Sequence, residues 1–153
     1  MAGKAALGVV IAGLAVAATT FSIVVVVLVL LVASTAGYAL ARPGLPGRKV
    51  LVGILVATMF IPHGYTIIPT FLLVNGLGLG NGLLGAALAQ AGPALVVPVL
   101  LFMGFFSGIP RELEEAARMD GAGYVRTYWR VMLPLAKPVM GTGALMNFIG
   151  AWN

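Results

Sequence analysis

The sequence contains few charges and no cysteine, and its longest stretches carry no charge at all. Only 8% of the 153 residues are charged, against about 25% in a soluble domain, so the chain cannot cover a water-facing surface. Lys, Arg, Asp and Glu are absent from Ala5 to Ala41 and again from Val50 to Pro110. Such runs accommodate several spanning helices, each of roughly 20 residues. We therefore expect an all-α integral membrane protein, without disulfides or thiolate metal sites.

The basic residues are confined to short segments between the apolar runs. Nine Lys and Arg give a net charge of +5, but apart from Lys4 they all lie within residues 41–49 and 109–137. Basic loops beside apolar spans are typical of the cytoplasmic side of a membrane, so both loops are expected there. This distribution argues against a nucleic-acid partner. The apolar run after Lys4 is also too long for the core of a cleavable signal peptide.

The apolar runs predict a helical bundle of about three full transmembrane helices and a partial fourth. The expected spans are residues 17–40, 50–74, 82–108 and 138–153. The run before residue 17 is expected to be an interfacial or partner-packed extension, and two spans joined near Gly13 are the weaker alternative. Pro93 and Pro98 predict a kink or a break in the third span. The uncharged loop 75–81 is expected on the outer side.

The last apolar stretch is too short to cross a membrane comfortably. The sequence therefore predicts a single incomplete transmembrane unit over residues 1–153, a fragment or a truncated relative of a longer protein.

Residues 111–134 contain all four acidic residues of the chain and four of its nine basic residues. Three acids open a predicted helix, where the helix dipole favours negative charge, and Ser107 or Gly108 is expected to cap it. Glu114 and Arg118 have the spacing of a favourable ion pair. Gly121 suits the left-handed residue that ends such a helix. The loop is therefore predicted to be a helix-turn-helix.

The second helix of this loop is predicted over residues 122–133 and to be closed by Pro134. Its predicted apolar face consists of Tyr124, Val125, Tyr128, Trp129 and Met132. An amphipathic helix of this kind lies on lipid headgroups or in a groove on a partner protein. The residues alone leave both interpretations open.

A longer pattern in the same loop resembles the EAA motif of the membrane subunits of bacterial ATP-binding-cassette importers. The motif residues are Glu115-Ala116-Ala117, Gly121 and Val131-Met132-Leu133-Pro134. Val131 stands where the family usually has Ile. The string from Ile109 to Ala122 is similar to the carbohydrate-importer branch.

The likeness extends over roughly residues 17–153. Its other parts are Tyr38 to Arg42 with Leu45 to Lys49, Ile61-Pro62 with Ile68-Pro69, Gly76 to Asn81, and Phe148 to Asn153. The family usually has six or so spans, and the chain lacks its first helix and everything after Asn153. It also has Ala17-Ala18-Thr19-Thr20 where an Asn-Ser pair is common.

The resemblance implies a sugar-importer permease subunit in the bacterial inner membrane. Its EAA loop would be a coupling helix that seats in a cleft of a cytoplasmic ATPase. The implied docking residues are Glu115, Ala116, Ala117, Asp120, Gly121, Ala122, Leu133 and Pro134. The implied partners are an ATPase dimer, a second permease subunit, an extracytoplasmic solute-binding protein and membrane lipid. Hydrolysis would belong to the ATPase, so neither enzymatic activity nor a cofactor nor a metal is expected of this chain.

Three polar residues in the spans are candidates for a translocation pathway. His63 is an ionisable group inside an expected span, although a packed or snorkelling role competes with a pathway role. Gln90 and Asn147 would face the pore or bond to a neighbouring helix, and the second role is favoured. A small membrane protein with a structural or interaction role, whose loop binds lipid or a partner, is the alternative to a permease.

Overall fold

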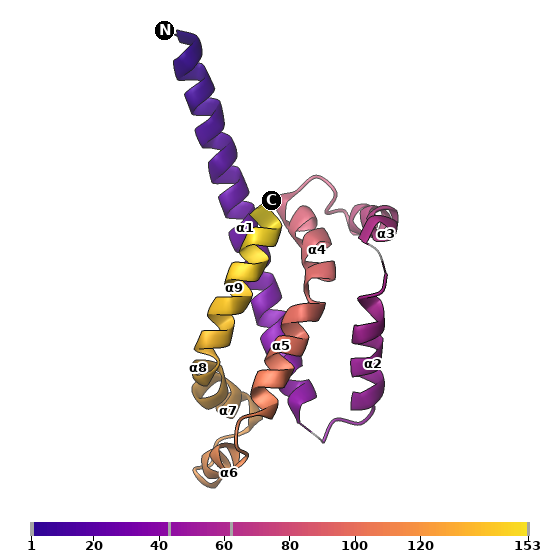
Figure 1. Cartoon of the computed structure of the whole chain (residues 1–153), viewed down its shortest axis with the longest axis vertical. Coiled ribbons are helices and arrows are strands. Elements are labelled where there is room, and N and C mark those ends of the chain that lie inside the picture. Colours follow the sequence, from indigo (N-terminus) through magenta and orange to yellow (C-terminus); the bar gives the residue numbers. More distant parts are fainter. Residues whose placement is uncertain (1, 43, 62, 153) are drawn as a thin grey trace.

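The computed structural model describes residues 2–42, 44–61 and 63–152, and the side chains of Ala2, Gly3, His63 and Gly64 fall outside this description. Within the described ranges the chain is helical and has no strand, as the sequence predicts. Figure 1 shows the arrangement of the helices. They are α1 (Ala2–Ala41), α2 (Arg48–Thr58), α3 (His63–Gly76), α4 (Leu83–Ala94), α5 (Val96–Ser107), α6 (Glu112–Met119), α7 (Tyr124–Thr127), the π-helix η1 (Tyr128–Met132), α8 (Leu133–Leu135) and α9 (Lys137–Trp152).

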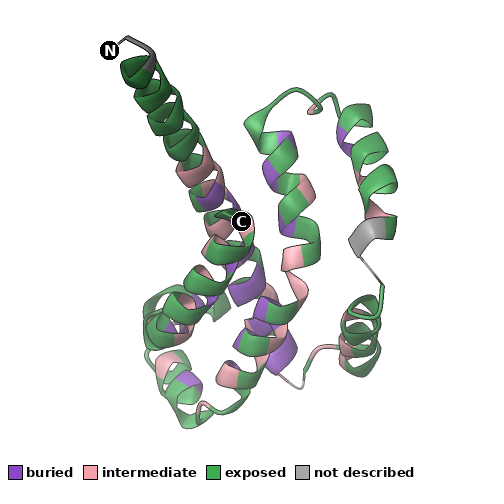
Figure 2. Ribbon diagram, turned by 45° about the horizontal axis from the view of Figure 1, so that its top comes forward, coloured by how far each residue is buried: buried purple, intermediate pink, exposed green. Residues whose placement is uncertain are grey.

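Helix α1 is continuous and longer than a membrane requires. Its 40 residues extend about 60 Å at a rise of ~1.5 Å per residue, about twice a hydrocarbon core of ~30 Å. Lys4–Ala41 is long and apolar enough to cross a membrane. The helix passes through Gly13 without a break, so the two-span alternative is not observed. Its N-terminal part is exposed and projects beyond the other helices (Figure 2).

The C-terminal part of α1 is the centre of the packing and contacts α4, α5 and α9. A buried stripe on α1 includes Val25, Val29 and Ala33, which recur every four residues and so share one face. On α5, Phe102 and Phe106 are completely buried in the larger core cluster. This cluster reaches the η1 and α8 region through Met132 and Ala136. The core thus joins α1 to the segment that contains the predicted motif.

The two expected spans after α1 are each divided. Residues 50–74 form parts of α2 and α3, which at 11 and 14 residues extend only about 17 and 21 Å. Helix α2 ends at Thr58 and α3 begins at His63. Ile61, between them, precedes a proline in the sequence, which disfavours a helical conformation there. Helices α4 and α5 form a pair bent by 56°. The bend lies at Leu95, between Pro93 and Pro98, and the predicted kink is confirmed.

By length and composition, the described residues contain one helix that can cross a membrane, or two if the bent pair α4 and α5 is one span. Helix α9 begins at Lys137 and has 16 residues.

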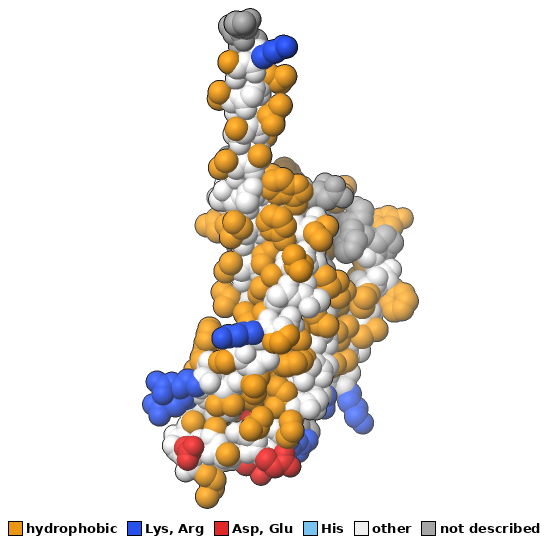
Figure 3. Space-filling model, turned by 60° about the vertical axis from the view of Figure 1, so that its left-hand side comes forward, with side chains coloured by type: hydrophobic (Ala, Val, Ile, Leu, Met, Phe, Trp, Pro, Cys, Tyr) orange, Lys and Arg blue, Asp and Glu red, His pale blue; other side chains and the backbone are white. Residues whose placement is uncertain are grey.

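The loops divide between the two ends of the bundle (Figure 1). The turn from α1 to α2 and the segment from α6 to α8 lie at one end, and the turn from α3 to α4 lies at the other. In the face shown in Figure 3, apart from a basic group near the N-terminus, the charged side chains gather toward the α6 end, below a surface rich in hydrophobic groups. The two basic loops that the sequence places on one side of a membrane are therefore at the same end of the molecule.

Candidate functional site

Helix α6 is a short charged helix with a well-defined C-terminal turn. Glu112, Glu114 and Glu115 occupy its first turn, where they interact favourably with the helix dipole. Gly121 follows it with φ 77°, the left-handed conformation that the sequence predicts. The Gly121 N–H donates to the Arg118 carbonyl at 2.9 Å, and the Ala122 N–H donates to the Ala117 carbonyl at 2.9 Å. These two bonds form a Schellman motif, which reverses the chain sharply after α6.

The predicted N-terminal cap of α6 is wrong. Ser107 is the last residue of α5, Gly108 follows it as the C-cap, and α6 begins only at Glu112. Arg111 occupies the N-cap position without a side-chain bond. Ser107 and Gly108 thus end α5, whose Phe106 is packed in the core, and do not start α6.

The second helix of the loop also differs from its prediction. It begins at Tyr124, after an extended Gly123, and continues past Pro134 to Leu135. Its middle is the π-helix η1, in which the Leu133 N–H donates to the Tyr128 carbonyl five residues earlier. Pro134 lies at the start of α8, close to this wider turn, and a π-turn is one of the known ways in which a helix accommodates an irregular hydrogen-bond ladder. Pro134 therefore does not end the helix.

The predicted apolar face of this helix is divided between the interior and the surface. Tyr128 and Met132 are buried, as predicted for a packed face. Tyr124, Val125 and Trp129 are exposed. The helix therefore turns only part of its apolar surface toward the core. On the outside, the Arg118 guanidinium lies over the Tyr124 ring, 4.5 Å from its centroid.

The residues predicted to dock a partner lie mostly on the surface of the α6 end. Glu115, Ala116, Asp120, Gly121 and Pro134 are exposed, and Ala117, Ala122 and Leu133 are half-buried. Glu115 to Ala122 form one continuous segment over the end of α6 and its turn. Leu133 and Pro134 lie beyond the π-helix, at the start of α8.

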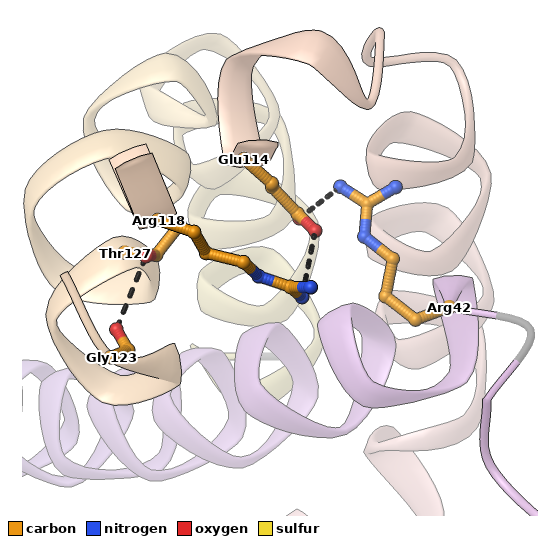
Figure 4. A network of polar contacts seen from close by, with 5 residues as sticks. All are labelled: Arg42, Glu114, Arg118, Gly123 and Thr127. Atoms are coloured by element: carbon orange, nitrogen blue, oxygen red, sulfur yellow. Dashed lines mark hydrogen bonds and ion pairs between the residues drawn. The ribbon is translucent and has the colours of Figure 1, made fainter. Parts of the chain in front are cut away.

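A buried ion pair behind α6 was not predicted from the sequence. Arg42, directly after α1, pairs with Glu114 of α6, as Figure 4 shows. The Glu114 side chain is only 6% exposed and that of Arg42 only 17%. The expected partner of Glu114, Arg118, lies 4.0 Å away on the half-exposed side. The principal partner is thus distant in sequence, which no local spacing rule detects.

A second buried contact connects η1 to α1. The hydroxyl groups of Tyr128 and Ser34 are 2.7 Å apart in a buried hydrogen bond. The Tyr38 ring packs between them and α5, with its centroid 5.3 Å from that of Tyr128 and 5.5 Å from that of Phe106. Burial raises the pKa of the Tyr128 hydroxyl, and the bond to Ser34 lowers it in part. The hydroxyl therefore stays protonated and bonded in the interior.

Removal of the Ser34 hydroxyl alone is expected to destabilise the fold more than removal of the Ser34 and Tyr128 hydroxyls together. Ser34→Ala leaves a buried phenol without its partner, at a cost of about 1–3 kcal/mol in the free energy of unfolding. The double variant Ser34→Ala/Tyr128→Phe removes both groups, and we expect it to recover part of that loss. Thermal unfolding of the purified protein in detergent measures the difference. Tyr124→Phe, at an exposed ring, is the matched control and should leave the unfolding temperature unchanged.

Two of the candidate pathway residues, Gln90 and Asn147, lie in different surroundings. Gln90 is exposed and lines an open cleft of about 930 Å³, with Thr70 and Asn75 among the other polar residues on its wall. Asn147 is buried and donates to the Gly143 carbonyl of its own helix at 2.8 Å. Its amide thus bonds within α9 rather than to a neighbouring helix. The side chain of His63 lies outside the described residues.

Comparison with known proteins determines the family. Residues 33–153 match the family described as the binding-protein-dependent transport system inner membrane component. The chain belongs to this family. The match includes α6, its turn and the whole of the η1 and α8 segment. The resemblance found in the motif residues is therefore confirmed, and the family consists of membrane components of transport systems rather than enzymes.

Among curated relatives, the diacetylchitobiose uptake system permease protein NgcG of Streptomyces coelicolor is 37% identical over 136 residues, which cover 86% of this chain and 45% of the relative. The trehalose transport system permease protein SugB of Mycobacterium tuberculosis is 33% identical over 131 residues, covering 86% of this chain and 48% of the relative. The alpha-glucoside transport system permease protein AglG of Rhizobium meliloti is 35% identical over 132 residues, which cover 83% of this chain and 35% of the relative.

A solved structure has the same fold. A chain of a bacterial ABC transporter involved in the import of the acidic polysaccharide alginate superposes with a TM-score of 0.80 at 34% identity. The match covers 90% of this chain and 48% of that one. This family member therefore spans about half the length, or less, of these relatives.

Proposed function

We propose that the chain is part of a permease subunit of an ATP-binding-cassette importer for sugars, in a bacterial inner membrane. The exposed α6 and its turn dock into a cytoplasmic ATPase dimer, and the helices around α1 respond by alternating access. A second permease subunit and an extracytoplasmic solute-binding protein complete the assembly. Sugars are proposed because the curated relatives compared here include uptake systems for diacetylchitobiose, alpha-glucosides and trehalose.

The observation that carries this proposal is the exposure of α6 and its turn at the end of the bundle where the two charged loops lie. Glu115 and Asp120 offer carboxylates for charge-assisted bonds to a basic groove. Ala116 is small enough for a close approach. Met119 and Val125, 88% and 72% exposed, flank this surface with apolar groups. Small, acidic and apolar groups on one protruding turn fit a groove on a partner protein.

A hairpin lying on lipid headgroups fits this surface less well. Helix α6 contains three acids and one base, so anionic headgroups would repel it. Tyr128 and Met132 of the second helix are turned into the core of the chain itself, where they are not available to lipid. Both features favour a protein partner over the membrane surface. Membrane lipid is then proposed as the surroundings of the apolar helices.

The pathway proposal is limited to the cleft lined by Gln90. The Gln90 amide and the polar side chains of Thr70 and Asn75 provide hydrogen-bond partners for hydroxyl-rich substrates. Asn147, engaged within its own helix, is not proposed to contact substrate.

Glu115→Lys tests the docking proposal, because the two interpretations predict effects of opposite sign. In a basic ATPase groove it replaces an attraction by a repulsion, which should cost at least about 2 kcal/mol, or roughly thirtyfold in affinity. On anionic lipid the added positive charge should strengthen binding. The measurement is the amount of ATP-hydrolysing subunit that co-purifies with the tagged protein from detergent-solubilised membranes.

Glu112→Lys is the matched control, since it makes the same charge change on the exposed first turn of the same helix, outside the motif. We expect it to retain the ATPase. Undiminished co-purification with Glu115→Lys would contradict the docking proposal.

A further inference from the structure

Helix α6 is short and is attached to the rest of the molecule by few buried contacts. It has eight residues and lies between two short connections, residues 108–111 and 120–123, each of which contains glycine. Such connections fix its distance from α5 and α7 but leave its orientation free to vary. Among the described residues of α6, Glu114 alone is buried. Helix α6 also contacts α7 and η1, and Glu114 is the side chain that attaches it in the interior.

Glu114 contacts the end of α1. Its partner Arg42 follows the last residue of that helix, where the dipole favours a positive charge. The Arg42 guanidinium also lies over the Tyr38 ring, 5.5 Å from the centroid, and Tyr38 packs against Phe106. Figure 4 shows Arg42 and Glu114 reaching toward each other from their two helices. The guanidinium is thus held on one side by α1 and directed at α6.

We infer that the Arg42–Glu114 pair is a fixed joint through which movement of α6 is passed to α1. This inference rests on the proposed function, because it assigns a path to the force that a docked ATPase exerts on α6. The chain itself connects α6 only to α5 and α7, whereas α1 packs against α4, α5 and α9. A joint to α1 delivers the displacement to the centre of the bundle. Arg42 and Glu114 are therefore positioning residues, with no contact to substrate or nucleotide.

The joint is tested in the assembled transporter by the number of substrate molecules moved per ATP hydrolysed. Arg42→Ala and Glu114→Gln should lower this ratio at least about fivefold, the lower end of usual coupling effects. Co-purification of the ATPase should remain, since the exposed docking residues are unchanged. Glu112→Gln is the matched control: it makes the same carboxylate-to-amide change on the exposed first turn of α6, outside the motif, and should leave the ratio unchanged.

A covalent replacement of the pair separates this role from a merely structural one. The chain has no cysteine, so Arg42→Cys/Glu114→Cys introduces its two thiols, and it leaves neither buried charge unpaired. A short thiol-reactive cross-linker should restore the transport ratio that the reduced double variant has lost. An unchanged ratio in the single variants, or a cross-linked protein that stays uncoupled, would overturn the joint. A wild-type protein that holds no ATPase would instead contradict the proposed function.

Discussion

Gly121→Val is expected to abolish transport and association with the ATPase while membrane insertion stays normal. Gly121 has φ 77°, a conformation that a β-branched residue adopts only at a cost of about 1–3 kcal/mol. A Cβ there would meet nothing within 4 Å, so the effect comes from the backbone and not from a clash. The strain is relieved if the turn rearranges, which breaks the two bonds of the Schellman motif. Glu115 to Ala122 then no longer present one continuous surface.

Gly123→Val is the matched control for this prediction. Gly123 lies two residues further along the same turn, is extended with φ −72° and ψ 170°, and has equal space around it. Valine adopts that conformation readily, so this variant should transport and bind the ATPase normally. The measurements are substrate uptake, ATPase co-purification and the amount of protein in the membrane fraction. Normal uptake by Gly121→Val would show that the turn geometry does not matter for docking.

The parts of the structure that follow from local chemistry could be predicted from the sequence. The left-handed turn at Gly121 needs only a glycine after a charged helix, and the bend between α4 and α5 needs only Pro93 and Pro98. The exposure of Glu115 and Asp120 agrees with their charge, although the equally charged Glu114 is buried. In each case the cause lies within a few residues of its effect.

The packing of α1 could not be predicted in the same way. Both faces of this helix are apolar, because one faces the other helices and the other an apolar exterior. Nothing in the pattern separates buried Val25 and Val29 from exposed Ile23 and Val27. Hydrophobic periodicity identifies a buried face only where the opposite face is polar.

Long-range polar contacts could not be predicted from the sequence for a different reason. Glu114 has a nearby candidate at the favourable spacing, Arg118, and sequence reasoning selects it. The structure pairs Glu114 mainly with Arg42 because the packing of α1 on α5 brings the two helix ends together. The buried bond between Tyr128, in the π-helix, and Ser34 of α1 is likewise a contact between residues distant in sequence. The motif can be recognised in the sequence, but the contacts that attach it to α1 can be seen only in the structure.

Gly37→Val should have a large effect on the packing of α1 against α5. A Cβ on Gly37 would lie 2.5 Å from the Phe102 Cβ, 2.9 Å from the Met103 backbone nitrogen and 3.0 Å from the Val99 carbonyl oxygen. Two of these atoms belong to the α5 backbone and cannot move aside as a flexible side chain would. Small residues allow such close contact between membrane helices. The helices must separate, at a cost at or above the usual ~1–3 kcal/mol for overpacking.

Gly104→Val provides the comparison, because Gly104 is an exposed helical glycine of α5 with nothing within 4 Å of an added Cβ. Both variants gain the same three carbon atoms in an apolar helix, so only the contact with α1 differs between them. We expect Gly37→Val to lower the unfolding temperature in detergent by roughly 5–10 °C and to reduce the amount of membrane-inserted protein, with Gly104→Val close to the wild type. Equal stability of the two variants would mean that α1 and α5 do not approach each other at Gly37. The joint between Arg42 and Glu114 would then lose its support too, because that contact sets the position of the end of α1.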